Sequence, residues 1–357
     1  MKKEKFNTRR YRIAHIHVWD KNNKGDQAIV LAVQELLIKK FPGALISNFP
    51  VEVLKNNDKT QVAKLNHADF IVIGGGGIFY SYFLPFNLEM IKAIYKPIFL
   101  FGLGYIKEVD APLWTQNKID SVIGLAKKAV GIGVRDLNTK RFLIAGGIKS
   151  TAIKIIGDPA ALLSEKIPSV TVMNKLKLPN RRVKIGLNLN YSGWLGFGKW
   201  RKEILAAYQE TAKYFQNEFA AEIYYLKHHP GEDNIYPELG IKNLKIVDLT
   251  PNAQKYVYGK MDLIIGMMLH VGVMSFGALT PEISVAYDIR NYGFAEFIGH
   301  KELVVDLNKL KNGQLLISAS QVFKKKKQYQ RQFLRRRKII AANFEKFLEA
   351  IKNKIDK

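Results

Sequence analysis

Residues 68–79 read ADFIVIGGGGIF and determine how the first half of the chain can fold. Within them, residues 70–73 form a short apolar run rich in β-branched side chains, which predicts a strand buried on both faces. Four glycines follow at once and permit backbone angles that other residues avoid. Two interpretations of this run stay open: a cradle of backbone N–H groups for an anion, and a tight turn from strand to helix without a ligand.

The pattern on both sides of this stretch predicts a parallel sheet. Short apolar runs alternate with amphipathic segments, as expected for right-handed crossovers in a doubly wound α/β domain. The expected strands are 13–18, 44–47, 70–73, 98–101, 129–134 and 153–156, and the expected helices are 26–39, 86–95, 113–128 and 138–145.

A second series of the same kind begins at residue 183. Its expected strands are 183–187, 222–226, 244–247, 263–265, 282–285 and 303–305, and its expected helices are 200–218, 253–258 and 270–277. The prolines, asparagines and basic residues between the two series show no convincing period and predict a linker. We therefore expect an α/β domain over 1–170, a linker over 171–182, a second α/β domain over 183–315, and a basic helical region over 316–357 that packs back on the body.

Length and composition agree with two domains inside a cell. The chain has 357 residues, of which 47% are hydrophobic, enough for two cores. It has no cysteine, which excludes disulfides and Cys-ligated metal sites and fits a cytoplasmic protein. No secretory signal is expected, because the apolar stretch 13–19 is short and contains His15 and His17. Residues 263–281 lack acidic and basic side chains, but their glycines, His270 and Ser275 fit a buried strand and helix better than a membrane span.

The charge of the chain is strongly unbalanced. The formal net charge is +25, and Lys324 to Lys338 carries nine basic residues and no acidic one. Such a segment can bind an anionic membrane surface, or it can be a solvated basic helix. Nucleic acid is the least favoured partner, because zinc-finger spacing, an RNP signature and a basic stripe interleaved with aromatics are all missing from the sequence.

Glycine or charged residues follow five expected strands of the first domain. The carboxyl ends of parallel strands line the crevice where ligands bind, so these positions favour a ligand site. No Gly-Lys-Ser/Thr follows the glycine run and no G-x-G-x-x-G opens a helix, which disfavours ATP and NAD.

The ordered set of these motifs resembles the polysaccharide pyruvyltransferase family from about residue 12 to residue 300. The motifs are Asn23-Lys-Gly25-Asp26, Asp69 with the glycine run, Gly102-Leu-Gly104, Val134-Arg135-Asp136, Gly157-Asp158-Pro159, Gly266-Met-Met-Leu-His270 and Tyr287-Asp-Ile-Arg290. The resemblance implies two Rossmann-like domains facing across a cleft, similar to the GT-B glycosyltransferase architecture. It also implies phosphoenolpyruvate as donor, no further cofactor, and a sugar of a surface-polysaccharide or lipid-linked precursor as acceptor of a pyruvate ketal.

The implied chemistry assigns expected roles to residues. A general acid must protonate the methylene carbon of phosphoenolpyruvate so that a sugar hydroxyl can attack C2, and His270 matches the family's histidine. The carboxylate and phosphate need cations and backbone N–H groups. Candidate substrate- or anion-binding residues are Gly74, Gly75, Gly76, Gly77, Arg135, His229, Arg290 and Asp26.

Several of these candidates have a purely structural alternative. Asp26, Asp136 and Asp158 each stand where they could cap a helix or turn. His228 and His229 are adjacent and point apart on an extended chain, so we expect no metal site there.

The family's arginine two residues before the histidine is Met268 here, and Arg290 stands where a lysine is usual. A thioether cannot pair with a carboxylate or phosphate, which leaves the donor open. Two alternatives therefore remain: a GT-B-like glycosyltransferase that uses a nucleotide-activated sugar, and a non-catalytic sugar- or polyanion-binding relative.

Overall fold

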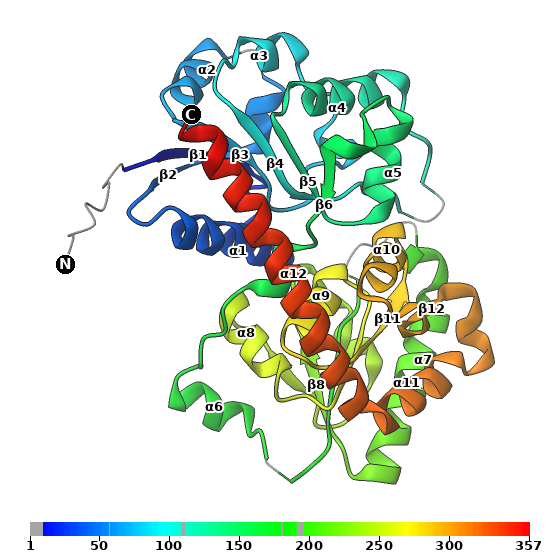
Figure 1. The fold of residues 1–357 in the computed structure, drawn as a ribbon. Coiled ribbons are helices and arrows are strands. Elements are labelled where there is room, and N and C mark those ends of the chain that lie inside the picture. The colour runs from blue at the N-terminus through cyan, green and yellow to red at the C-terminus, as the bar shows by residue number, and fades with distance from the viewer. Residues whose placement is uncertain (1–9, 57, 109–110, 180, 191–195) are drawn as a thin grey trace, which may run out of the picture.

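The computed structural model describes residues 10–56, 58–108, 111–179, 181–190 and 196–357, so residues 1–9 of the first predicted domain and Asn180 of the predicted linker lie outside it. The described residues form two parallel sheets of six strands each, with helices on both faces (Figure 1). The predicted class, two doubly wound domains with a helical C-terminal region, is confirmed.

The first sheet has the strand order β2-β1-β3-β4-β5-β6. Its strands are β1 Arg12–His17, β2 Leu45–Pro50, β3 Phe70–Ile73, β4 Ile98–Leu103, β5 Gly131–Val134 and β6 Ile153–Ile155. The helices of this half are α1 Lys24–Lys40, α2 Lys59–Asn66, α3 Leu88–Ala93, α4 Gln116–Lys128 and α5 Leu137–Ala145.

The alternating side chains of β3 show why both faces of this sheet are covered. Phe70 and Val72 lie in one core with the buried face of α1, whereas Ile71 and Ile73 lie in another with buried residues of α3 and α4. Since successive side chains of a strand point to opposite faces, a continuous apolar run requires helices on both sides. Residues 70–73 are therefore a doubly buried strand, as predicted.

The second sheet has the order β12-β11-β10-β7-β8-β9. Its strands are β7 Lys184–Leu187, β8 Glu222–Leu226, β9 Lys245–Val247, β10 Leu263–Gly266, β11 Glu282–Ala286 and β12 Val304–Asp306. The remaining helices are α6 Val170–Leu176, α7 Gly196–Phe219, α8 Pro251–Tyr258, α9 Leu269–Gly277, α10 Ile289–Ile298, α11 Gln314–Lys324 and α12 Lys326–Ile355.

Three helices, α2, α6 and α10, form where the sequence patterns predicted none. Helix α6 occupies the first half of the predicted linker. Its sequence VTVMNKL is short and rich in β-branched residues, and the Ser169 hydroxyl accepts a hydrogen bond from the Val172 N–H at its start. Residues 263–281 form β10, α9 and the following turn, as the sequence predicted, and no helix in the described parts of the chain is long and apolar enough to cross a membrane.

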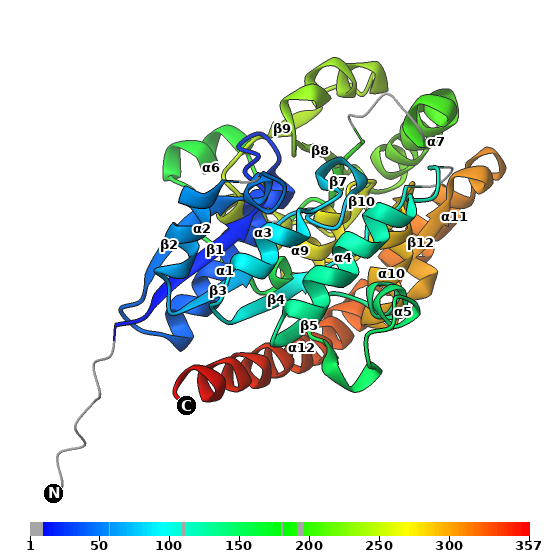
Figure 2. The same cartoon turned by 90° about the horizontal axis from the view of Figure 1, so that it is seen from above.

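Helix α12 returns from the second domain to the first, as expected for the C-terminal region (Figure 1, Figure 2). Phe344 and Phe347 pack on Phe101 of β4, with ring centroids 5.4 and 5.8 Å apart. A Cβ atom on Gly133 would lie 3.0 Å from the Phe347 ring, so the absence of a side chain in β5 makes room for it. The helix therefore joins the two domains along one side.

Polar contacts also join the two domains. Lys24 at the start of α1 donates to the carbonyl of Lys227 (2.7 Å) and to Asp248 (2.5 Å). Lys255 of α8 is 2% exposed, and its ammonium donates to Ala161 (2.9 Å) and Leu163 (2.6 Å) after β6. Buried charges persist where hydrogen bonds compensate their lost hydration, so these lysines fix how the domains meet.

Candidate active site

A cleft of about 680 Å³ lies between the two domains. Its lining residues all follow the carboxyl ends of strands, as expected for ligand sites in parallel sheets. From the first domain come Val18, Trp19, Asp20, Asn23, Asp26, Glu52, Gly77, Tyr80, Tyr82, Phe83, Ile106 and Glu108; from the second come Asn190, Met268, Leu269, His270, Tyr287 and Arg290.

The glycine run forms a close-packed turn whose last residue reaches the cleft. Gly75 and Gly76 have φ of 102° and 84°, and a Cβ on Gly76 would lie 2.5 Å from Val18 Cβ. Gly74 N–H donates to the Ile16 carbonyl (3.1 Å), and Gly77 N–H donates to the Asp26 carboxylate. Gly74, Gly75 and Gly76 are buried behind the wall, so Gly77 is the member of the run that a ligand can touch.

His270 lies at the start of α9 and is 7% exposed to the cleft. Its Nε2 lies 3.7 Å from Asp158 Oδ2 and has no hydrogen-bond partner within the described residues. The ring rests against Gly25 of the other domain, where a Cβ would lie 2.4 Å from Nδ1. Burial, followed by the charges of Arg135 and Arg290, lowers the pKa of His270 well below its ordinary value, which favours the neutral imidazole.

Arg135 lies behind this wall rather than on it. It is 4% exposed, and its guanidinium pairs with Asp158 (3.3 Å) and Asp136 (3.4 Å). Both carboxylates also cap the segments that follow them. Asp136 accepts a hydrogen bond from the Thr139 N–H (2.8 Å) at the start of α5, and Asp158 accepts one from the Ala160 N–H (3.0 Å) in the next turn. Arg135 therefore holds Asp158 beside His270 and is not itself part of the cleft lining.

Asp26 and Arg290 face the cleft from opposite domains. Asn23, not Asp26, caps α1; Asp26 lies in the first turn. Burial and Asp20 raise the pKa of Asp26 to about 7, while Arg290 and the Gly77 N–H oppose the rise. Arg290 Nη2 lies 2.9 Å from Asp288 Oδ2, and its Nε has no hydrogen-bond partner in the part of the chain described. The cleft thus has a carboxyl group that titrates near neutral pH on one side and a charged guanidinium on the other.

The stretch after β8 lies outside the cleft lining. His229 caps the 3-10 turn Pro230–Asn234, and its Nδ1 accepts from Gly231 N–H (2.9 Å). Lys227 pairs with Asp233 (2.7 Å), and the buried His228 is hydrogen-bonded to the Tyr258 hydroxyl. Among the described residues, no group of three or more His, Cys, Asp or Glu is arranged to hold a metal ion. His229 thus has a structural role in this state.

Met268 occupies the cleft wall two residues before His270. Its backbone N–H donates to Asn188 Oδ1 (3.2 Å), which fixes the turn into α9. The thioether brings no charge, so Arg290 is the cation among the described lining residues.

Sequence reasoning did not single out the aromatic and carboxylate residues on the first-domain side. Trp19 and Tyr82 are 51% and 73% exposed, and Glu52 and Glu108 lie beside them in the lining. The available signal was their place in the loops that follow β1, β2, β3 and β4, to which the strand-end argument could have been extended.

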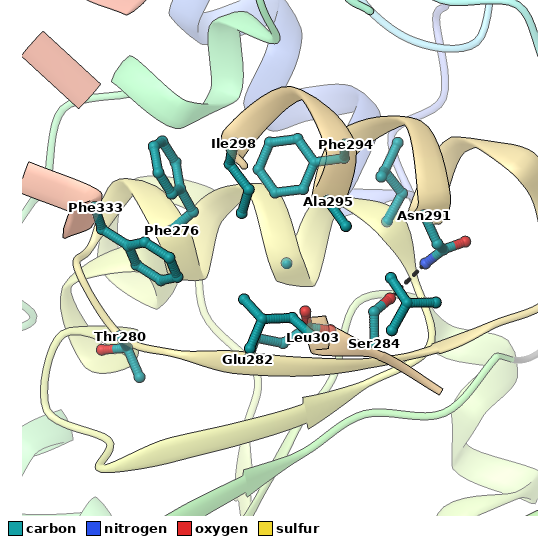
Figure 3. A pocket seen from close by; sticks show the side chains of 13 residues that line it. Phe276, Thr280, Glu282, Ser284, Asn291, Phe294, Ala295, Ile298, Leu303 and Phe333 are labelled. Carbon is teal, nitrogen blue, oxygen red and sulfur yellow. Dashed lines mark hydrogen bonds between the residues drawn. The ribbon is translucent and has the colours of Figure 1, made fainter. Parts of the chain in front are cut away.

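A second, much smaller cavity lies in the second domain. Its volume is about 20 Å³, enough for a water molecule but not for a substrate. Figure 3 shows Glu282, Ser284 and Asn291 facing it together with Phe276, Phe294 and Phe333. Burial raises the pKa of Glu282 well above its ordinary value, and its Oε1 has no hydrogen-bond partner among the residues described.

The fold and the interdomain cleft define the GT-B class of two-domain enzymes, and solved structures agree. A putative UDP-N-acetylglucosamine 2-epimerase from Listeria monocytogenes is similar at 12% identity, with 91% of each chain covered and a TM-score of 0.58. HepE from Anabaena, solved in complex with UDP-glucose, is similar at 11% identity over 96% of this chain and all of its own, with a TM-score of 0.58. At such identities the likeness shows the fold alone.

A model of the polysaccharide pyruvyl transferase family matches residues 23–289. The chain belongs to this family of transferases. No curated protein matches it.

Proposed function

We propose that the protein transfers an enolpyruvyl unit from phosphoenolpyruvate to a sugar and forms a pyruvate ketal. One observation carries the proposal: in a chain of this family, a single cleft brings Gly77 and Asp26 of one domain together with His270 and Arg290 of the other. These groups supply a cation for the donor and two acid–base groups for proton transfer.

The donor binds on the wall of the second domain. Arg290 pairs with the carboxylate or phosphate, and its Nε, which lacks a partner among the described residues, donates to the same anion. His270 is neutral before binding, because burial and two arginines lower its pKa. The negative charge of the donor opposes both arginines and raises that pKa, so the imidazolium forms when the donor is in place.

The reaction then requires proton transfers at His270 on one wall of the cleft and at Asp26 on the other. His270 gives a proton to the methylene carbon, and a sugar hydroxyl forms a bond to the electrophilic C2. Asp26, with a pKa of about 7, accepts the hydroxyl proton. The C–O bond to phosphate breaks, and phosphate leaves with its electron pair. A second sugar hydroxyl then attacks C2 to close the ketal, and its proton passes to the imidazole of His270, which gave up its own proton in the first step.

Phosphate release tests this function. The full chain is incubated with phosphoenolpyruvate and a panel of sugar acceptors, and inorganic phosphate and a ketal product are measured. His270→Gln should abolish release, and Arg290→Lys should retain more of it than Arg290→Met. If no phosphate is released with any acceptor and phosphoenolpyruvate causes no thermal shift, phosphoenolpyruvate is not the donor.

A nucleotide-activated sugar is the second candidate donor, and Met268 in the place of an arginine is the observation that favours it. The same thermal-shift assay with UDP-sugars separates the two donors. A shift with UDP-sugars and none with phosphoenolpyruvate would establish this candidate, whereas binding of sugars without turnover of either donor would indicate the non-catalytic relative.

The acceptor is a sugar of a surface-polysaccharide or lipid-linked precursor, and we place the reaction at the cytoplasmic face of a membrane. The basic segment Lys324 to Lys338 supports this location. Lys324, Lys325, Lys327, Arg331, Arg335 and Lys338 are exposed there. An exposed basic helix is attracted to anionic lipid.

A further inference from the structure

Aromatic side chains gather at the mouth of the cleft, on the side of the first domain. Trp19 follows β1 and is 51% exposed, and Tyr82 in the turn Ser81–Phe83 is 73% exposed. Phe83 and Tyr80 line the same hollow, and the rings of Tyr82 and Phe83 lie 5.1 Å apart. Aromatic rings exposed singly are common, but a group of them at a cleft mouth marks a binding surface.

The charges of the cleft are divided between its walls. Within the described lining, the first domain contributes four carboxylates and the second contributes Arg290 and His270; the carboxylates are those of Asp20, Asp26, Glu52 and Glu108. Carboxylates accept hydrogen bonds from hydroxyl groups and repel other anions. A ligand on the aromatic side is therefore rich in hydroxyl groups and carries no negative charge.

Trp19 also separates the cleft from a neighbouring groove. This groove has a volume of about 240 Å³ and is lined by His17, Val18, Trp19, Asp20, Lys21, Gln27, Val30 and Leu31. Because Trp19 and Asp20 line both hollows, a chain of linked units can run from one to the other across the indole. A single small molecule would occupy only the cleft or only the groove.

We propose that this surface is the acceptor subsite and that it binds a neutral oligosaccharide of at least two sugar units. A pyranose has a face of C–H groups that packs on the electron-rich face of an aromatic ring, while its edge hydroxyls reach polar groups. Trp19 and Tyr82 stack on sugar rings, and Asp20 and Glu52 accept their hydroxyls. The assignment as acceptor rests on the proposed transfer, since the terminal sugar must present its hydroxyls to Asp26 and His270.

The test is a glycan array probed with the labelled full chain. The array carries neutral, N-acetylated, uronic-acid and sulfated oligosaccharides, and calorimetry then measures the affinity of the strongest neutral ligand and of its terminal monosaccharide. Trp19→Ala and Tyr82→Ala should each weaken binding about tenfold. Trp19→Phe keeps a ring and should retain most of it. Tyr95→Ala is the matched control, because Tyr95 is also 73% exposed but lies outside the cleft lining.

The expected result is selective binding of neutral oligosaccharides that the two alanine variants lose and Tyr95→Ala keeps. Several results would overturn the subsite: preference for acidic glycans, equal affinity for the monosaccharide, unchanged binding in both variants, displacement by UDP, or no glycan bound. Thermal shift with phosphoenolpyruvate is measured in parallel. Glycan binding without a donor response rejects the transfer and keeps the sugar site, whereas normal turnover in both variants rejects the sugar site and keeps the transfer.

Discussion

The protonation of His270 depends on what occupies the cleft. Its low pKa follows from burial and from Arg135 and Arg290, while Asp158 at 3.7 Å is too far for a strong hydrogen bond. A bound anion reverses the electrostatic balance, so donor binding and protonation of the imidazole are linked.

We therefore expect phosphoenolpyruvate to bind with uptake of about one proton near neutral pH. The pKa of His270 is below ambient pH in the free protein and rises in the complex, so affinity falls as pH increases between these two values. Titration calorimetry in two buffers of different ionisation enthalpy measures the uptake. His270→Gln should abolish it; uptake that persists in this variant and disappears in Asp26→Asn would assign the proton to Asp26 instead.

Glu282 provides a stability prediction. Its folded-state pKa is raised by burial, so the carboxyl costs stability as pH rises above its ordinary value of about 4.5. The cost grows by about 1.4 kcal/mol per pH unit until the folded-state pKa is reached. Glu282→Gln should raise the free energy of unfolding at pH 7.5, and this gain should vanish near pH 4.5. Urea denaturation at both pH values measures it. The same change at exposed Glu218 is the control, and a gain independent of pH would contradict the burial argument.

At the scale of elements, helix α12 has one face that packs and one that is solvated. Lys326 pairs with Asp262 (2.5 Å), and Arg336 and Arg337 donate to the carbonyls of Phe297 and Gly277. These three basic residues are held against the body, so the surface available to a membrane is smaller than the sequence indicated.

Reversing the charge of Lys324, Lys325 and Lys327 to Glu should release the protein from anionic liposomes. Each lysine near such a surface contributes about 1 kcal/mol, so partitioning should fall about a hundredfold or more. Sedimentation with phosphatidylserine vesicles measures it, and Lys326 is left intact to preserve its ion pair. A triple reversal at exposed Lys59, Lys64 and Lys92 controls for total charge. Equal loss in both triple variants would mean that net charge, not this helix, causes binding.

The packed face of α12 gives a separate prediction. Phe347 is 7% exposed and fills the space above Gly133. Phe347→Ala should lower the free energy of unfolding by about 3 kcal/mol or more, because it leaves a cavity against the sheet. Ile339→Ala on the same helix, at a site 50% exposed, should cost under about 0.5 kcal/mol. Similar losses at both positions in denaturant titrations would show that α12 does not stabilise the first domain through this contact.

The elements show which parts of the structure sequence patterns could predict. Doubly buried strands such as β3 and β10 have unambiguous apolar runs, and both were predicted. Helices α2, α6 and α10 were not predicted. KTQVAKLN and VTVMNKL are short, and IRNYGFAEFI mixes glycine, aromatic and polar residues, so tertiary packing decides all three.

The site was predictable to the extent that strand ends converge. Asp26, Gly77, His270 and Arg290 meet in the cleft because each follows a parallel strand. The direction of a side chain is not fixed by its place after a strand, which is why Arg135 turns behind the wall and His229 caps a turn. The aromatic rings at the mouth of the cleft were not predicted, because the exposure of a side chain depends on how loops far apart in the sequence pack together.

At the scale of the whole molecule, the first turn of α1 connects the interface to the cleft. Lys24 is bonded to the second domain, Gly25 supports the ring of His270, and Asp26 lines the cleft.

Gly25→Ala should therefore impair turnover without unfolding the protein. Alanine favours a helix over glycine by about 1 kcal/mol, but its Cβ would lie 2.4 Å from His270 Nδ1 and force the ring to move. We expect kcat with phosphoenolpyruvate to fall at least about tenfold while Tm stays within a few degrees. Gly259→Ala is the comparison for the glycine change itself, because Gly259 is exposed, lies outside the cleft lining and would have its nearest Cβ contact at 3.4 Å. Normal turnover in Gly25→Ala would mean that the position of this ring does not matter to the reaction.

The contact between Gly25 and His270 also has a consequence for inheritance and engineering. The imidazole is encoded in one half of the gene and the backbone on which it rests in the other, so neither half specifies a complete reactive centre. Exchanging a domain with a relative would preserve both folds and still bring together a ring and a surface that had not been selected for each other. In such hybrids, the residue at position 25 should come from the same protein as the histidine at position 270.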